Sequence, residues 1–356
     1  MVLPKADIHP ISTHDAQVPT RRIAKVRMKD VAEHAGVSTR TVSNVVNNYV
    51  HVSPQMRDLV QRSLIELGYQ MDYVARGLRS GRTGLIALVL PNLSEPYFAK
   101  LAEAVIRAAH GKHLNVMVEM SGGDLEVEVG IMRGTRATLA DGVLLTSAAS
   151  GMTGASCGSV VMMGEHAAFQ ELQYVGIDNV AAARTIVNHL LERGYGRIAA
   201  LGVQDTDVGR QRYRGDQLAL ADSGKEEHRP LKLVGHDWSP QAGYDAVLRM
   251  LRRRTKRPDA IFAFNDSLGI GALRALQANQ ITVPEQVAVA GIDDIPQSAF
   301  ASPPLTSVAP DLDELAGRAV DLLDSQLEGR AGRPPYQPTI TCFKLVVRAS
   351  TDVRQR

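Results

Sequence analysis

A run of short and forked hydrogen-bonding side chains between residues 38 and 53 has the composition of a surface that reads DNA. It lies in the stretch MKDVAEHAGVSTRTVSNVVN, which begins at Met28. Val42, Val45 and Val46 share one side of an expected helix, and polar side chains fill the other side. Such side chains reach base edges and phosphates in a major groove. The alternative is a helical mini-domain that binds protein, with the same side chains as a solvated face.

Three short helices would position this polar side. Gly36 breaks the first helix, Ser38 caps the second, and Ser53-Pro54 begins a third helix that ends at Gly68. Apolar positions on all three helices predict one small shared core, to which the third helix would contribute Met56, Leu59, Val60, Leu64 and Leu67.

A basic segment follows, Tyr73 to Thr83 (YVARGLRSGRT), with three arginines and an apolar Leu78. So short a helix nucleates poorly alone, and we expect it to fold on DNA. A leucine inserted between base steps of the minor groove kinks a duplex, and nearby arginines neutralise part of the negative charge of the phosphates. The alternative is a basic linker in which Leu78 packs under a neighbouring element.

Composition limits the function classes. The chain has 356 residues and a net charge of only +2, so DNA binding must depend on local clusters of positive charge. Two cysteines give no disulfide pattern and no metal-ligand spacing, which fits a reducing cytoplasm. No apolar run reaches the length of a signal sequence or a membrane span, so we expect a cytoplasmic protein without membrane contact.

Signatures of catalysis are missing from the sequence. It contains no GxxxxGK[ST] phosphate loop, no GxSxG elbow and no HExxH metal pair. The glycine pair Gly269 and Gly271 has Arg274 where a dinucleotide fingerprint requires a third glycine. We therefore expect a protein that is not an enzyme and holds no cofactor and no metal.

From Leu85 the residue pattern changes: short runs of apolar, often β-branched residues alternate with stretches that have helical periodicity, in two successive series. This pattern predicts parallel sheets covered on both faces. Ligands of such sheets bind beyond the carboxyl ends of the strands. Polar or aromatic residues at those ends form a set suited to sugar hydroxyls and an apolar ring face: Arg212, Trp238, Asn265 and Asp293.

Plainer roles compete with this interpretation. Asp266 and Asp294 follow the same strands and could be helix caps instead of ligand contacts. Trp238 could belong to the core, and Arg212 could pair with a surface acid.

The motifs together resemble the lactose/galactose-repressor family of bacterial transcription regulators. The resemblance rests on MKDVAEHAGVSTRTVSNVVN, ELGY, VARGLRSGRTGLIALVLPN, FNDSLGIGALRAL and VAGIDD, and runs from about Met28 to Ser350. It implies that Thr39, Arg40 and Asn44 face bases and that Leu78 is the minor-groove wedge. Asn44 stands where many relatives have Arg, so its base is open. The residues implied near the DNA backbone are Ser38, Ser43, Asn47, His51 and Ser53.

The resemblance also implies an α/β fold with an N-terminal three-helix helix-turn-helix domain and a periplasmic-binding-protein-like effector domain of two parallel-sheet subdomains. Arg212, Trp238, Asn265 and Asp293 match positions where relatives hold their effector, and Tyr97 and Phe98 would close the ligand from the first subdomain. The expected boundaries are a disordered tail (1–26), the helix-turn-helix domain (27–72), a hinge (73–84) and the effector and dimerisation domain (85–356). The first subdomain would span about 85–177 and 312–340, and the second about 178–311 and 341–356.

We therefore expect a repressor whose affinity for a near-palindromic operator is controlled by a small sugar-like effector. No leucine-heptad tail follows Ser350, so a homodimer is expected. Two alternatives remain: a regulator of the same family that responds to purines or another metabolite, and a soluble solute-binding protein.

Overall fold

The computed structural model describes residues 26–46, 49, 51–69, 82–133, 139–146, 158–164, 172–224, 231–232, 237–253, 256–329 and 338–352. The chain divides into two compact units, the first ending at Asp72 and the second beginning at Tyr73. Residues 1–25 of the expected tail, most of the expected hinge with Leu78, and Asn47 lie outside the described residues.

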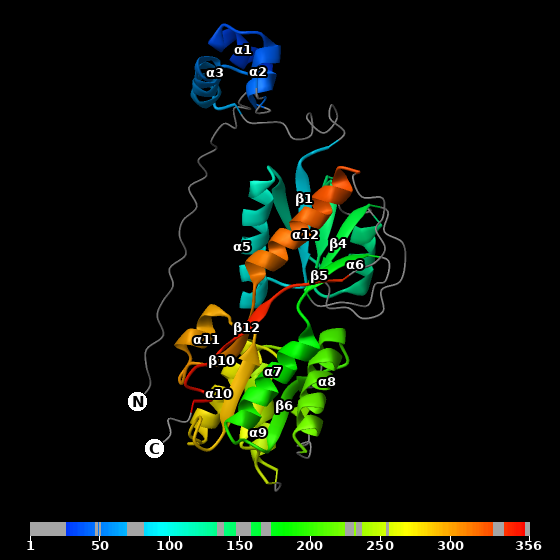
Figure 1. Cartoon of the computed structure of the whole chain (residues 1–356). Helices are drawn as coiled ribbons and strands as arrows, with labels where there is room; N and C mark the ends of the chain where they lie inside the picture. The colour runs from blue at the N-terminus through cyan, green and yellow to red at the C-terminus, as the bar shows by residue number, and fades with distance from the viewer. Residues whose placement is uncertain are drawn as a thin grey trace, which may run out of the picture. The chain divides into compact units, whose positions relative to one another are not determined.

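The described residues of the first unit form three helices, α1 (Met28–Ala35), α2 (Thr39–Val46) and α3 (Pro54–Glu66) (Figure 1). Gly36 ends α1 with a φ of 64°, a left-handed conformation that costs glycine little. The Ser38 hydroxyl accepts the Thr41 amide at 3.1 Å, and the Ser53 hydroxyl accepts the Met56 amide at 3.4 Å. These local caps fix where α2 and α3 begin.

Small apolar side chains from all three helices form the expected core, namely Val31, Ala32, Ala35, Val42, Val45 and Val60. The prediction for α3 is wrong at two points. The helix ends at Glu66 rather than at Gly68, and Leu59 is 39% exposed. Ser63 is buried instead, because its hydroxyl bonds the His34 ring at 3.1 Å and the Leu59 carbonyl at 3.2 Å.

The second unit consists of two lobes, each built on a six-stranded sheet. The sheet of the first lobe has the order β11-β5-β4-β3-β1-β2, with all its pairs parallel. Its strands are β1 (Leu85–Leu90), β2 (Asn115–Met120), β3 (Gly142–Leu145), β4 (Ser159–Met163), β5 (Gln173–Gly176) and β11 (Thr339–Ile340). Its helices are α5 (Pro96–Gly111), α6 (Leu125–Met132) and α12 (Leu312–Leu327).

Alternation along β1 shows why this lobe has helices on both faces of its sheet. Ile86, Leu88 and Leu90 pack with α5 and α12, whereas Ala87 and Val89 belong to a second core on the side of α6. Successive side chains of a strand point to opposite faces, so a central strand covered twice must be apolar throughout. In Figure 1, α12 runs across α5 and β4, which it contacts.

The sheet of the second lobe has the order β12-β10-β9-β8-β6-β7. Its strands are β6 (Ile198–Val203), β7 (Leu231–Lys232), β8 (Ala260–Ala263), β9 (Ala288–Ile292), β10 (Thr306–Pro310) and β12 (Phe343–Val346). Its helices are α7 (Asn179–Glu192), α8 (Asp207–Asp222), α9 (Pro240–Leu251), α10 (Asp266–Ala278) and α11 (Pro296–Phe300). The sheet departs from the all-parallel expectation at its edge, because β12 enters from the other lobe and pairs antiparallel with β10.

The chain passes between the lobes three times, after β5, after β10 and after β11. Two of these segments lie side by side, since the Thr341 amide donates to the Gly176 carbonyl at 2.8 Å. The Asp311 amide likewise donates to the Cys342 carbonyl at 3.0 Å. Paired segments of this kind form a junction about which two lobes can close on a ligand.

Candidate functional site

The outer side of α2 carries the side chains expected to read DNA. Thr39 and Arg40 are exposed, and Ser43 and Asn44 are half-buried. Because the valines of α2 turn into the core, this polar side remains open to a partner. Base contacts by Thr39, Arg40 and Asn44 stay a prediction.

The residues expected near the DNA backbone have structural duties as well. The Ser38 and Ser53 hydroxyls cap α2 and α3, and Ser38 also bonds the Thr41 hydroxyl at 2.9 Å. His51 is exposed and stacks edge-on with Tyr49, with ring centroids 5.5 Å apart. A serine oxygen that accepts a capping amide can still donate its O–H, so a hydrogen bond to a phosphate oxygen remains compatible with this geometry.

In the second lobe, Arg212 of α8 is the centre of the expected ligand set, and its side chain is buried. Its Nε donates to Asn179 Oδ1 at 2.9 Å, and its Nη1 donates to the Phe264 carbonyl. Its Nη2 lies 3.8 Å from Asp293 Oδ1. The guanidinium carbon is also 5.5 Å from the centre of the Trp238 ring. The alternative of a surface ion pair is therefore wrong for Arg212.

Trp238 and Asn265 hold each other in place beside this guanidinium. The indole Nε1 donates to the Gly202 carbonyl at 3.2 Å, and the ring meets Phe264 edge-on. Asn265 is the N-cap of α10, since its Oδ1 accepts the Leu268 amide at 2.9 Å. Its Nδ2 donates to the Trp238 carbonyl at 3.2 Å. The structure therefore brings Arg212, Trp238 and Asn265 together at the ends of β6 and β8.

Asp293 follows β9 and completes the set from a strained backbone. Its φ is 115°, which is costly for a residue with a side chain, and the next residue, Asp294, also has a positive φ of 47°. The amide of Asp293 is fixed by a bond of 2.8 Å to the Val308 carbonyl. A strained backbone conformation persists only where the surrounding structure holds it. At Asp293 this conformation directs the carboxylate towards Arg212.

Asp266 supplies part of that support. Its buried carboxylate accepts the Ser298 hydroxyl at 2.5 Å, the Ser307 hydroxyl at 2.7 Å and the Ile295 amide at 3.1 Å. Burial raises the pKa of Asp266 to about 7, although the three hydrogen bonds oppose this shift. Asp266 thus ties the beginning of α10 to the loop that carries Asp293.

The capping alternative is wrong for both Asp266 and Asp294. Asn265 caps α10, and Ile295 occupies the N-cap position of α11. The Asp294 carboxylate instead pairs with Arg348 at 2.6 Å. Tertiary partners from distant parts of the chain take both carboxylates, and local sequence does not reveal such partners.

From the first lobe, Tyr97 and Phe98 have different environments. Phe98 is buried in the core between α5 and its sheet, so it does not line an open pocket. Tyr97 is half-buried and packs edge-on against Phe98, with ring centroids 5.4 Å apart. Tyr97 therefore remains the candidate contact, and Phe98 supports it from beneath.

Glu95, which sequence reasoning missed, reaches across the lobes. Its Oε2 accepts the Ser267 hydroxyl of α10 at 2.8 Å. Burial raises its pKa, the bond to Ser267 opposes this shift, and the negative charge of Asp237 adds to it. Its position in the short segment between the carboxyl end of β1 and the beginning of α5 is the signal that could have identified it.

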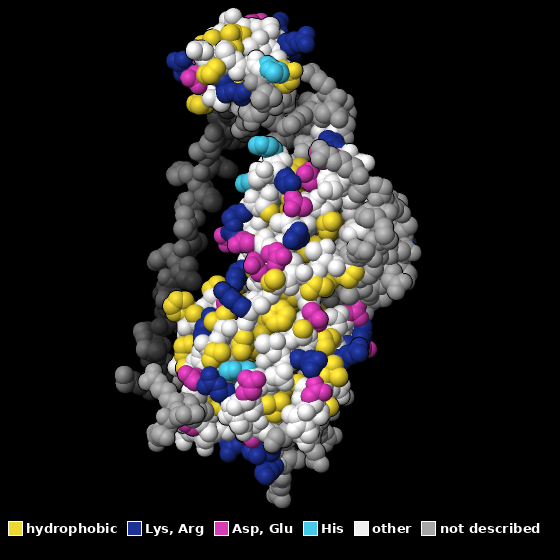
Figure 2. Space-filling model, viewed as in Figure 1, with side chains coloured by type: hydrophobic (Ala, Val, Ile, Leu, Met, Phe, Trp, Pro, Cys, Tyr) yellow, Lys and Arg dark blue, Asp and Glu magenta, His cyan; other side chains and the backbone are white. Residues whose placement is uncertain are grey.

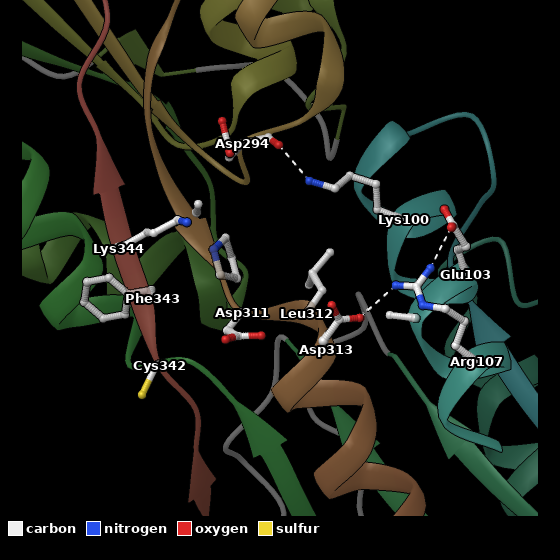
Figure 3. A pocket seen from close by; sticks show the side chains of 13 residues that line it. Lys100, Glu103, Arg107, Asp294, Asp311, Leu312, Asp313, Cys342, Phe343 and Lys344 are labelled. Atoms are coloured by element: carbon white, nitrogen blue, oxygen red, sulfur yellow. Dashed lines mark hydrogen bonds and ion pairs between the residues drawn. The ribbon is translucent and has the colours of Figure 1, made fainter. Parts of the chain in front are cut away.

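A separate pocket of about 460 Å³ lies at the junction of the lobes and is lined by none of the expected ligand residues (Figure 3). Arg107 bridges Glu103 at 2.6 Å and Asp313 at 2.7 Å, and Lys100 donates to the Asp294 carbonyl at 2.8 Å. On the face seen in Figure 2, positive and negative side chains are likewise interspersed over the lobes. Both partners of Arg107 line this pocket, and Lys100 links the first lobe to the Asp294 carbonyl of the second lobe.

Comparison with known proteins places both units. Residues 27–72 match the model of the bacterial regulatory proteins of the lacI family, and residues 187–351 match a periplasmic binding protein-like domain. The HTH-type transcriptional regulator CelR of Thermobifida fusca is 33% identical over 323 residues, which are 85% of this chain and 92% of the relative. The ribose operon repressor of Escherichia coli (strain K12) is 29% identical, over 83% of this chain and 91% of the relative.

Solved structures agree with this picture. A lac repressor dimer bound to operator and the anti-inducer ONPF is 25% identical, with a TM-score of 0.75 over 92% of this chain and 99% of that chain. A complex of the regulator CelR with cellobiose is 29% identical, with a TM-score of 0.63 over 91% of this chain and 99% of that chain. The expected fold class is thereby confirmed. In the part of the chain that the structure describes, no helix is long and apolar enough to cross a membrane.

Proposed function

The chain belongs to the LacI family of bacterial transcription regulators, and from that premise we propose that a small sugar-like molecule bound between its two lobes controls its affinity for operator DNA. One observation carries the proposal. A buried arginine, an amide and a carboxylate meet beside the chain's single tryptophan at the ends of parallel strands. This unit is joined in one chain to a helix-turn-helix unit.

The chemistry of the set suits hydroxyl groups. Arg212 donates hydrogen bonds, Asp293 accepts them, and Asn265 does both. The half-buried indole of Trp238 offers an apolar surface of the kind on which sugar rings pack. Tyr97 and Glu95 would meet the ligand from the first lobe. Because the polar groups already hold one another in position, little order would be lost when a ligand binds.

On the DNA side, α2 would lie in the major groove, with Thr39, Arg40 and Asn44 at base edges. The hydroxyl, amide and imidazole groups near the DNA backbone would be those of Ser38, Ser43, Asn47, His51 and Ser53, with Leu78 as the wedge in the minor groove. The domain boundaries proposed from the sequence are kept: 27–72 for the helix-turn-helix domain, 73–84 for the hinge and 85–356 for the effector domain.

Relatives support the remaining assignments. The lac repressor structure is a dimer on its operator, CelR is seen with cellobiose, and another relative represses the ribose operon. We infer a homodimer on a near-palindromic operator in the cytoplasm, with no catalytic role. Two copies of α2 would then reach successive major grooves.

Ligand binding would act by favouring one arrangement of the lobes. Among the described residues, two hydrogen bonds join the lobes besides those of the crossing segments: Glu95 with Ser267, and Lys100 with the Asp294 carbonyl. Both begin on or directly before α5 and end beside the proposed ligand residues. A ligand that prefers one lobe arrangement would shift the population, and operator affinity would follow.

A fluorescence titration tests the proposal. Trp238 is the only tryptophan, so intrinsic emission reports on the proposed site. Purified protein would be titrated with monosaccharides, disaccharides, sugar phosphates and purines, and a saturable change with a sugar is expected. The exposed Arg210→Ala variant is the control, and Arg212→Ala should lose the response. A saturable change with purines alone would establish the purine-responsive alternative.

The solute-binding alternative is tested by truncation. A fragment that begins at Leu85 should bind the ligand and lack specific DNA binding. Full-length protein that binds the ligand but selects no sequence from random duplexes would favour a solute-binding protein.

A further inference from the structure

We propose that the ligand is an uncharged or amine-bearing polyhydroxyl compound that carries no phosphate group. The proposal rests on the ligand cleft described above and specifies what that cleft accepts. It follows from the distribution of charge around the cleft.

The described residues beyond the carboxyl ends of strands β1 to β9 include no Lys and no Arg, and these are the positions where ligands of parallel sheets bind. These residues are 91–95, 121–124, 146, 164, 177–178, 204–206, 237–239, 264–265 and 293–295. Acidic residues are common in them, including Glu95, Asp237 and Asp293. The loops towards the ligand are therefore one-sided in charge.

Arg212 is the cation within the proposed ligand set, and its guanidinium already has protein partners. Its three nitrogens face Asn179, the Phe264 carbonyl and Asp293. A phosphate would have to compete with the Asp293 carboxylate for the Nη2 edge, and a displaced carboxylate would be left buried without its partner.

Two other cations lie close by, and both are directed to Asp294. Lys100 donates to its carbonyl at 2.8 Å, and Arg348 donates to its carboxylate at 2.6 Å. Arg348 offsets the charge of the Asp294 carboxylate, whereas Lys100 bonds only a carbonyl and keeps its own charge. Four carboxylates (Glu95, Asp237, Asp293 and Asp294) therefore face three cations (Arg212, Arg348 and Lys100), and the net charge of these groups is negative.

The environment of Glu95 agrees with this balance. Burial and the charge of Asp237 both raise its pKa, and Ser267 is the hydrogen-bond donor that opposes them. Phosphate carries between one and two negative charges at neutral pH and would add to the repulsion. A neutral hydroxyl group is not repelled by the negative charge of the cleft, and an ammonium group is attracted by it.

Charged quenchers test the inference without knowledge of the ligand. Cesium and iodide would each be titrated against Trp238 emission of the full chain at constant ionic strength, with quenching normalised to N-acetyltryptophanamide. Cesium should quench at least about twofold better than iodide, because the local potential concentrates cations. Iodide that quenches as well as cesium, or better, would overturn the inference.

Two variants locate the source of the preference. Glu95→Gln combined with Asp237→Asn should bring the cesium and iodide constants towards equality. The matched control is Glu192→Gln, an exposed carboxylate at the far end of α7, which should leave their ratio unchanged. A double variant that keeps the wild-type ratio would also overturn the assignment.

Sugar pairs separate this inference from the proposed function. Glucose, glucosamine and glucose 6-phosphate would be compared by titration, together with the neutral and phosphorylated forms of any sugar that binds. Phosphorylated forms should bind at least about tenfold more weakly than their parents. A phosphorylated form that binds more tightly would overturn the inference and leave the ligand cleft standing. Cesium preference without binding of any sugar would uphold the acidic cleft and overturn the sugar effector.

Discussion

The two regions proposed to recognise other molecules are built in opposite ways. On α2, Thr39 and Arg40 are exposed, and only the valines on the opposite side of this helix pack into the small core. In the second lobe, Arg212, Asn265 and Asp293 are buried, and each is bonded to its surroundings. Base reading and folding thus use different residues on α2, whereas ligand binding and folding use the same residues in the cleft. Substitutions should therefore separate affinity from stability on α2 and change both together in the cleft.

The largest effect is expected for Arg212→Ala. Removing the guanidinium leaves Asn179, the Phe264 carbonyl and Asp293 without their buried donor, at a cost of about 3–5 kcal/mol. Urea unfolding followed by Trp238 emission measures this loss. Arg210→Ala is the control, because the Arg210 side chain is half exposed in its pairs with Asp205 and Asp207, so these pairs should contribute less than about 1 kcal/mol. Equal losses in the two variants would contradict the buried network.

The next effect concerns Asp266 and pH. Its pKa is about 7 in the folded chain against 3.8 for the free group, so the folded state retains a proton between those values. The free energy of unfolding should therefore fall as pH rises from about 4 to 7, by on the order of 2–4 kcal/mol from this group. Urea unfolding at a series of pH values measures the slope. Asp266→Asn has no carboxyl group to titrate at this position, so the pH dependence of its free energy of unfolding should be smaller over this range. An unchanged dependence would exclude Asp266 as the group responsible.

A smaller effect, confined to binding, is expected on α2. Arg40→Ala should weaken operator binding by about 1–3 kcal/mol and relax the preference at one base pair. Thermal stability should stay within about 0.5 kcal/mol, because the side chain is exposed. Arg62→Ala removes the same charge from α3 and is the control. An Arg40 variant with an unchanged binding-site preference would exclude this residue from base reading.

The smallest effect is expected for the cap of α3. Ser53→Ala removes the acceptor for the Met56 amide and should destabilise the first unit by about 1 kcal/mol. Ser53→Asn keeps an acceptor at that position and should retain most of the stability. Circular dichroism of a fragment ending at Asp72 would compare the two, and equal melting temperatures would exclude a capping role.

Local signals in the sequence were sufficient for much of the fold. Serine caps, Gly36 and the spacing of the valines act within one helix turn, and the apolar strands of a doubly covered sheet are readable one by one. The misplaced core position on α3 shows the limit. Spacing gives the period of a helix, but the neighbouring helices decide that Ser63 is covered and Leu59 is not.

The sequence predicted that Arg212, Trp238, Asn265 and Asp293 lie close together, but it did not predict their hydrogen-bond partners. Strand ends pointed to Arg212, Asn265 and Asp293, because topology fixes where strand ends meet. Glu95 and Ser267 are 172 positions apart, and the partners of Asp266 lie up to 41 positions away. Such contacts depend on the packing of whole elements, which no local pattern reports.

The coupling between cleft and DNA is the central claim, and operator affinity with and without ligand tests it most directly. The full chain would be titrated onto an operator selected from random duplexes, by fluorescence anisotropy, with and without a sugar that saturates Trp238 emission. Saturating sugar should change the operator Kd by about 5- to 150-fold in the wild type and leave it unchanged in Arg212→Ala. A sugar that saturates the Trp238 signal while the wild-type operator Kd stays the same would contradict the account.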